Sequence, residues 1–195
     1  MMLCVRLTNL ASEYWGRWLC SSLLLILSSH SLATQGTDWL ETQTNPDGSY
    51  ASPTDIAVPY QATAEVLKTF NLNGVSQQQA GVAAALQFIN AETYHNTENL
   101  ARKIITFASS NQNVNALLTE LVAMQNVDGG FGELSGYHSS VLDTAFALQA
   151  LNAGAFSDDI IISNAINYLE RQQDSNGGFG LGLPNNSSIN ITAQV

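Results

Sequence analysis

Cysteine and basic residues are scarce in this sequence of 195 residues. The only two cysteines, Cys4 and Cys20, stand near the N-terminus, so residues 34–195 contain no thiolate for a disulfide, a zinc site or nucleophilic catalysis. Six lysines and arginines stand against sixteen acidic residues, and the formal net charge is −10. Nucleic acids and anionic membranes are both held by clusters of cations. The composition therefore argues against both as partners.

Long apolar runs are also rare. The one at residues 18–27 contains ten residues, against the roughly 20 that a transmembrane helix needs, and no later run reaches 18. Arginines precede this run, and small residues follow it up to Ala33. That order is typical of a secretory signal peptide. We therefore predict a signal peptide over residues 1–33 and export to the periplasm, the cell surface or the exterior. An uncleaved N-terminal anchor is the alternative.

Residues 34–195 are organised by a repeated segment. Three stretches align without gaps, at 39–50, 120–131 and 168–179. Each contains a leucine, then an Asp or Asn followed by glycine, then an aromatic residue, and a Thr-Ala pair begins thirteen residues after the aromatic. Because this spacing is kept through loops of different composition, it predicts three equivalent turns. Their residues are Asp47, Gly48 and Tyr50 in the first, Asp128, Gly129, Gly130 and Phe131 in the second, and Asn176, Gly177, Gly178 and Phe179 in the third.

The segments between these turns show the apolar periodicity of helices. In residues 141–151 apolar side chains recur at steps of three and four, and Ser140 followed by Asp143 is typical of a helix start. A weaker copy of the repeat is predicted at 88–96, where Asn96 takes the place of the aspartate. Strand signals are nearly absent, so we predict an all-α fold made of helical hairpins. The expected helices span about 56–70, 76–91, 98–108, 113–125, 139–152 and 158–173.

Residues 124–151 combine a glutamine, an Asp-Gly-Gly-Phe-Gly turn and a later Thr-Ala pair. This segment resembles the repeat of the prenyltransferase and squalene-cyclase family, and residues 168–182 resemble it next best. The resemblance implies an α/α toroid, in which inner and outer helices alternate around a central cavity. In triterpene cyclases the related turn ties a glutamine and an aromatic residue to neighbouring helix ends. We therefore expect Gln125 and Gln172 to brace the turns by binding carbonyls left open at the helix end.

The catalytic residues of that family are mostly missing from the matching positions. Cyclases that protonate an alkene use an Asp-x-Asp-Asp-Thr-Ala motif, and the matching stretch here places Leu142 at the proton donor and keeps only Asp143. We interpret Asp143 as a helix-capping carboxylate and retain it as a minor catalytic candidate. Protein prenyltransferases often place a histidine like His138 after the turn, but their zinc and diphosphate sites need cysteine and basic residues. His138 is the second minor candidate, and we predict no metal site and no cofactor.

Two further patterns are weaker. Asn45, Asp47 and Gly48 loosely resemble a calcium-binding loop, but the other acidic ligands of such a loop are missing. His95 stands beside two glutamates, without a second histidine at the spacing of a metal site. We expect these residues to belong to a structural turn and a solvated loop.

A closed toroid needs about five to seven helix pairs, and this sequence has room for about three. The last repeat stops where the second continues into a helix. We therefore expect residues 34–195 to form an incomplete α/α toroid, an open arc that is truncated at its C-terminus. Its apolar edge would be covered by missing C-terminal repeats or by an unknown protein partner, and an apolar ligand is a further candidate.

These observations predict an exported, non-catalytic toroid module with an interaction or scaffold role, as a fragment of a larger secreted or surface protein. The alternative is a terpene cyclase or prenyltransferase whose catalytic residues lie in a missing part. A glycan-binding or glycan-cleaving toroid is a third hypothesis, suggested by acidity and export alone. Turnover of squalene or of an isoprenoid diphosphate would separate the first two.

Overall fold

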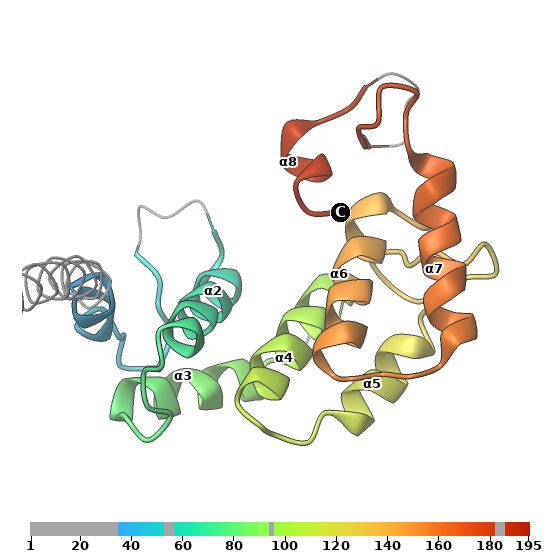
Figure 1. Ribbon diagram of the computed structural model, residues 1–195. Coiled ribbons are helices and arrows are strands. Elements are labelled where there is room, and N and C mark those ends of the chain that lie inside the picture. The colour runs from blue at the N-terminus through green and yellow to red at the C-terminus, as the bar shows by residue number, and fades with distance from the viewer. Residues whose placement is uncertain (1–34, 53–56, 94–95, 182–185) are drawn as a thin grey trace, which may run out of the picture. The chain divides into compact units, whose positions relative to one another are not determined.

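The computed structural model describes residues 35–52, 57–93, 96–181 and 186–195 (Figure 1). The predicted signal peptide, with both cysteines, lies outside these ranges. The chain divides into two compact units, Met1–Thr42 and Gln43–Val195. In the first unit residues 35–41 are helical. The second unit contains all three predicted turns and the helices between them.

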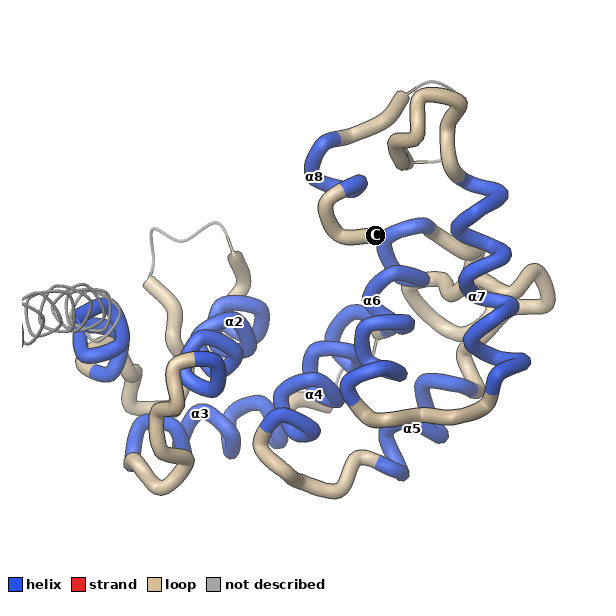
Figure 2. The backbone as a smooth tube through the Cα atoms, viewed as in Figure 1, coloured by secondary structure: helices blue, strands red, loops and turns tan. Residues whose placement is uncertain are grey.

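Helices joined by turns make up the second unit, and its described residues contain no β-strand (Figure 2). This confirms the all-α class predicted from the sequence. The helices are α2 (Pro59–Leu72), α3 (Ala80–Ala91), α4 (Thr97–Ser109), α5 (Asn115–Val122), α6 (Val141–Ala153), α7 (Asp159–Gln172) and the short α8 (Ile189–Thr192).

Most predicted helices lie within a few residues of the observed ones, but two boundaries were wrong. The helix expected from residue 76 begins at Ala80, because the Ser76 hydroxyl accepts a hydrogen bond from a backbone N–H two residues later, at 3.3 Å, within a turn of its own. The helix expected to reach residue 125 ends at Val122, because Gln125 forms an antiparallel bridge with Phe131. Local bonding in the adjoining turns therefore shortens both helices.

The helices form two series. In the first, α2, α4 and α6 lie side by side, and α4 contacts both of the others, most extensively α6. In the second, α3 contacts α2 and α4, α5 contacts α4 and α6, and α7 contacts α6 (Figure 1). Consecutive helices thus pair as hairpins, and the hairpins stack through α2, α4 and α6.

The core lies between these helices and follows from their apolar faces. In α4, Leu100, Ile104 and Phe107 recur at steps of three and four residues, and all are buried. α6 contributes Ala147 and Ala150, both fully buried. Small side chains let packed helices approach closely, which is consistent with the extensive contact between α4 and α6.

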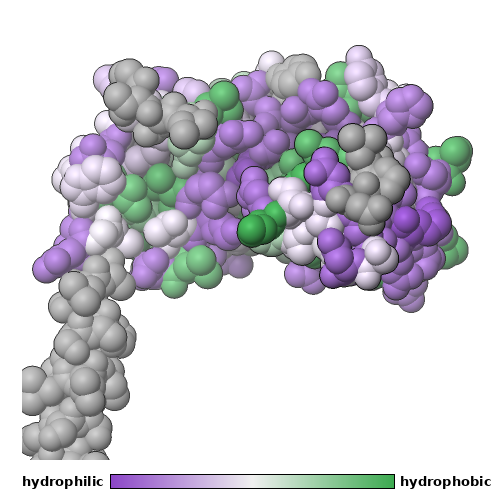
Figure 3. Space-filling view, turned by 90° about the horizontal axis from the view of Figure 1, so that it is seen from above, coloured by the Kyte–Doolittle hydropathy of each residue, from purple (hydrophilic) through white to green (hydrophobic). Residues whose placement is uncertain are grey.

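The surface is mixed in character. On the face drawn in Figure 3, hydrophilic residues predominate and hydrophobic residues form small groups. None of the described helices combines the length and the apolar character that crossing a bilayer requires.

Candidate functional site

The three predicted turns are built by the same backbone bonds. In the second turn (126–131), the N–H of Gly129 donates to the carbonyl of Asn126, and the N–H of Asn126 donates to the carbonyl of Gly130, each at 2.9 Å. The first turn (45–50) and the third turn (174–179) contain both bonds at equivalent positions. The three segments therefore share one backbone geometry.

Each turn contains a glycine in the left-handed region, where residues with a Cβ are rare. The angle φ is +87° at Gly48, +87° at Gly129 and +84° at Gly177. Two of these glycines also touch a neighbouring helix. A Cβ on Gly129 would lie 2.4 Å from the carbonyl oxygen of Asn164 in α7, and one on Gly48 would lie 2.5 Å from that of Ala84 in α3. A Cβ on Gly177 would meet no described atom within 4 Å.

A carboxylate or amide oxygen closes each turn. Oδ1 of Asp128 accepts a hydrogen bond from the N–H two residues later at 3.0 Å, and Asp47 and Asn176 make the same bond at 2.9 Å. In the second turn the Ser139 hydroxyl donates to the same oxygen at 2.7 Å. In the first turn Ser49 supplies both bonds, which lower the pKa of Asp47. Asp47, which belongs to the calcium-loop alternative, is thus bound to its own turn.

A threonine ties each turn to the helix that follows. The N–H of Phe131 donates to the Thr144 hydroxyl, and this hydroxyl donates to the carbonyl of Ser140 at 2.7 Å. The bond accounts for the spacing of thirteen residues in the sequence. The spacing is visible in the sequence, but the role of the threonine is not. The N–H to hydroxyl distance is 2.9 Å in all three turns, for the pairs Tyr50–Thr63, Phe131–Thr144 and Phe179–Thr192.

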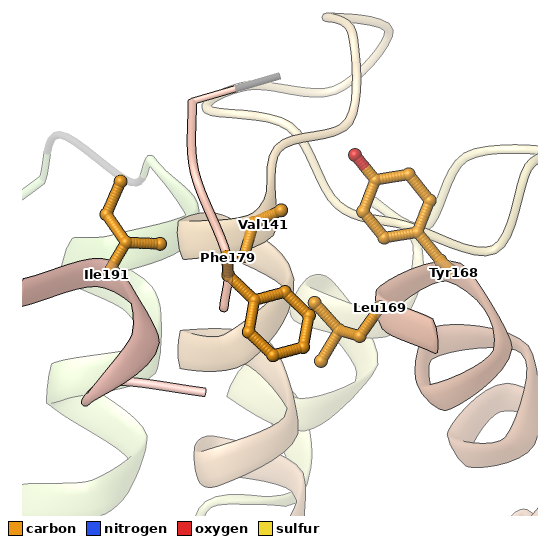
Figure 4. Close-up of a cluster of buried hydrophobic side chains, with 5 residues drawn as sticks. All are labelled: Val141, Tyr168, Leu169, Phe179 and Ile191. Carbon is orange, nitrogen blue, oxygen red and sulfur yellow. The ribbon is translucent and has the colours of Figure 1, made fainter. Parts of the chain in front are cut away.

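The aromatic residue of each turn is buried. The Tyr50 ring meets the Phe70 ring of α2 edge-on, with centroids 5.7 Å apart. Phe131 is fully buried beneath the second turn. In the third turn the aromatic ring joins a cluster drawn from α6, α7 and α8 (Figure 4). This cluster consists of Val141, Tyr168, Leu169, Phe179 and Ile191.

A glutamine braces the second turn at Gln125, but the third turn uses a different residue from the one expected. Nε2 of Gln125 donates to the carbonyl of Gly129 and to a carbonyl of α7, both at 2.9 Å. In the third turn Gln173 donates to the carbonyl of Gly177 at 2.8 Å. The choice of Gln172 was wrong by one residue, because the bracing glutamine stands four residues before the glycine. Gln172 instead lines a pocket of about 120 Å³ beside the start of α6.

The register predicted for the weaker copy at 88–96 was also wrong. Asn96 caps α4, because its side-chain oxygen accepts a hydrogen bond from the backbone N–H three residues later, at 2.7 Å. Only residues 92–96 connect α3 to α4, which leaves no room for a turn followed by a loop. Asn96 therefore corresponds to Ser140, the cap of α6. His95 lies outside the described residues.

The two minor catalytic candidates have different surroundings. Asp143 belongs to a cap at the start of α6 that is similar to a capping box, with the Ser140 hydroxyl in place of the Ser140 N–H. The N–H of Asp143 donates to the Ser140 hydroxyl at 3.0 Å, and that hydroxyl donates to the Asp143 carboxylate at 2.6 Å. Burial raises the pKa of Asp143, and the hydrogen bond from Ser140 works against this rise. His138 is exposed. Among the described residues, no group of three or more His, Cys, Asp or Glu side chains could hold a metal ion.

The raised pKa of Asp143 predicts a pH-dependent stability. A carboxyl whose pKa is higher in the folded state binds its proton more tightly there, so its contribution to stability falls as the pH rises through that pKa. Asp143→Asn should remove this fall, while its amide oxygen can still accept the Ser140 bond. In urea unfolding from about pH 4 to pH 7, the stability of the protein relative to the variant should decrease. The opposite slope would mean that the helix N-terminus favours the carboxylate more than burial penalises it.

Two basic residues hold backbone carbonyls. The Lys103 side chain is buried in α4, and its Nζ donates to the carbonyls of Asn90 and Glu92 at the end of α3, at 2.9 and 3.2 Å. Burial lowers the pKa of Lys103. Nη2 of Arg171 donates to the carbonyl of Asp128 at 2.6 Å, and so ties α7 to the second turn. Neither role could be predicted from the sequence, because every residue type has a backbone carbonyl.

Arg102 joins three helices. Its Nε donates to Glu98 in α4 at 2.9 Å, and its Nη1 donates to Glu65 in α2 at 2.5 Å. The guanidinium carbon lies 5.0 Å from the centroid of the Phe146 ring in α6, within the range of a cation–π contact. Arg102, Glu65 and Phe146 line a pocket of about 200 Å³ between the helices. The pocket is the second candidate site, and it was not predicted from the sequence.

Comparison with known proteins does not identify a family. No protein-family model matches the chain, and no curated protein is similar to it.

Proposed function

We propose that the chain is an exported, non-catalytic repeat module of the α/α-toroid type, with an interaction or scaffold role. The observation that carries this proposal is the common construction of the three turns, in which one threonine bond of 2.9 Å recurs. Turns of the same geometry orient each hairpin in the same way relative to the next one. Hairpins stacked in this way present an extended binding surface. The polar side chains of these turns bond within the repeat.

The order of the helices supports the toroid part of the proposal. In an α/α toroid, inner and outer helices alternate along the chain. Here α2, α4 and α6 contact one another in sequence, and α3, α5 and α7 alternate with them. The resemblance of residues 124–151 to the prenyltransferase and squalene-cyclase repeat favours the same architecture. On this proposal α2, α4 and α6 are the inner helices.

Exposed apolar side chains support the interaction role. Of the ten large apolar side chains that are exposed among the described residues, five lie within 159–195. Ile189 is the most exposed of these, at 92%. Exposed large apolar side chains are more frequent in this repeat than in the rest of the described residues, which favours contact with a partner. We propose that a protein partner or further repeats contact α7 and α8 there. Export is proposed from the composition of residues 1–33.

The proposal predicts that exposed apolar residues of the last repeat hold a partner. The full chain recovered from the secreted fraction of its host should elute in size-exclusion chromatography together with one protein at a constant ratio. The double variant Ile160→Lys and Ile189→Lys should elute alone, because it replaces two exposed apolar side chains of this repeat, one at the start of α7 and one at the start of α8, with charges. Asn167→Lys, also exposed on α7, adds a charge without removing an apolar side chain and should keep the partner.

Two outcomes would contradict this function. One is elution of the unmodified chain alone from the native secreted fraction. The other is turnover of squalene or of an isoprenoid diphosphate by the purified chain, measured by chromatography of the extracted products. Turnover that disappears in Asp143→Asn would indicate a cyclase type of activity. We expect no turnover, because leucine at position 142 cannot donate the proton that such a reaction needs.

A further inference from the structure

The pocket beside Arg102 is lined by both apolar and charged side chains. The apolar ones are Ala64, Ile105 and Phe146, and of these Ala64 and Phe146 are buried. The side chain of Arg102 is only 15% exposed, whereas that of Glu65 is 56% exposed. On another side the amide of Gln149 donates to a backbone carbonyl after α8, at 2.8 Å. The volume of about 200 Å³ lies below the roughly 300–1,000 Å³ of sites for drug-sized ligands, so a ligand here must be small.

Charged side chains of both signs meet at this pocket, and Glu98 pairs with Arg102 from outside the lining. Arg102 stands between the carboxylates of Glu98 and Glu65, and the second oxygen of Glu65 lies 4.0 Å from Nζ of Lys68. Glu98 also accepts a hydrogen bond from Gln61 at 2.8 Å. Two carboxylates and two cations make the group formally neutral. The hydrogen bonds of Arg102 to the two glutamates use its Nε and Nη1, so Nη2 can donate to a ligand and the pocket offers donors as well as acceptors.

A ligand with a single charge fits this balance poorly. An anion would have to displace a glutamate from Arg102, and a cation would meet carboxylates that are already paired. Either one would leave a net charge in a partly buried site, where charge is costly. A ligand that carries both a positive and a negative charge can replace both members of an ion pair at once, so the site stays neutral. Its carboxylate can bind Nη2 of Arg102 and the ammonium of Lys68, and its ammonium can bind Glu65.

We propose that this pocket binds a small zwitterion, a free amino acid with an apolar side chain. The charged head group lies between Lys68, Arg102 and Glu65, and the side chain lies on Phe146 and Ile105. The inference goes beyond the proposed function and does not depend on export, on the toroid or on a protein partner. It stands on the packing of α2, α4 and α6 and on four charged side chains.

The test uses three molecules that share the leucine side chain and differ in charge. L-leucine is a zwitterion, leucinamide is a cation and N-acetyl-leucine is an anion. Isothermal titration of the full chain at neutral pH should give a Kd for leucine at least tenfold lower than for either of the others. The proposal is overturned if leucine shows no saturable binding, or if all three molecules bind equally.

Charge variants make the test specific for this pocket. Glu65→Gln leaves a net positive pocket, so the preference should move from leucine to N-acetyl-leucine. Lys68→Gln leaves a net negative pocket and should move the preference to leucinamide. Both residues are more than half exposed, so we expect the fold to persist. Glu170→Gln removes a carboxylate from α7, away from the pocket lining, and should leave the preference for leucine unchanged. If both pocket variants kept the preference for leucine, leucine would bind outside this pocket and the proposal would be overturned.

Discussion

Gly129→Ala should destabilise the protein by about 2–5 kcal/mol, the largest effect we expect from a single methyl group. A residue with a Cβ at φ +87° costs roughly 1–2 kcal/mol in the left-handed region. The new Cβ would also lie 2.4 Å from the carbonyl oxygen of Asn164, so α7 would have to move, and overpacking of this kind costs about 1–3 kcal/mol. Urea unfolding followed by circular dichroism measures the sum.

The other two turns separate the backbone term from the packing term. Gly177 has nearly the same φ, but a Cβ there meets no described atom within 4 Å, so Gly177→Ala should cost only about 1–2 kcal/mol. Gly48→Ala meets the carbonyl of Ala84 at 2.5 Å and should resemble Gly129→Ala. Equal losses of stability in Gly129→Ala and Gly177→Ala would contradict this prediction. They would mean that the new Cβ at position 129 meets no costly contact with α7.

The turns could be predicted from the sequence because their determinants are local and repeated. A left-handed backbone position favours glycine, as at Gly129. A side-chain oxygen that accepts the N–H two residues later favours Asp or Asn, as at Asp128. The pair can therefore be recognised in the sequence. The thirteen-residue spacing to Thr144 was visible for the same reason. Its meaning was not, because the spacing does not show which atom the hydroxyl binds.

The charged pocket could not be predicted, because it depends on which helices are neighbours. Glu65 and Arg102 are 37 residues apart in the chain, and Phe146 stands on a third helix. No periodicity within one helix relates these positions. Gln172 shows a related limit at short range. The sequence does not distinguish between two adjacent glutamines. Only the geometry of the turn shows that Gln173, and not Gln172, donates to the carbonyl of Gly177.

Thr144→Val should cost about 1–3 kcal/mol although it hardly changes the volume of the side chain. The threonine is fully buried, and its hydroxyl is the acceptor for the N–H of Phe131 at 2.9 Å. Valine leaves that buried N–H without this partner, and an unsatisfied buried donor costs roughly 1–3 kcal/mol. The carbonyl of Ser140 keeps a bond from the backbone N–H of residue 144, so the loss falls mainly on Phe131. Urea unfolding gives the cost, and faster hydrogen exchange at the Phe131 amide should accompany it.

Two variants decide whether the hydroxyl or the methyl group of Thr144 is responsible. Thr144→Ser keeps the acceptor and should lose only about 0.8 kcal/mol for the missing methyl group. Thr192→Val removes the same kind of acceptor from Phe179, but Thr192 is exposed and water can replace the bond, so the loss should be smaller than at Thr144. If valine cost nothing while serine lost about 1–3 kcal/mol, packing of the methyl group would hold the second turn and the repeated 2.9 Å bond would be incidental. Rescue by serine would instead show that one hydroxyl fixes the helix start to the turn, which is the relation that the repeat preserves in all three copies.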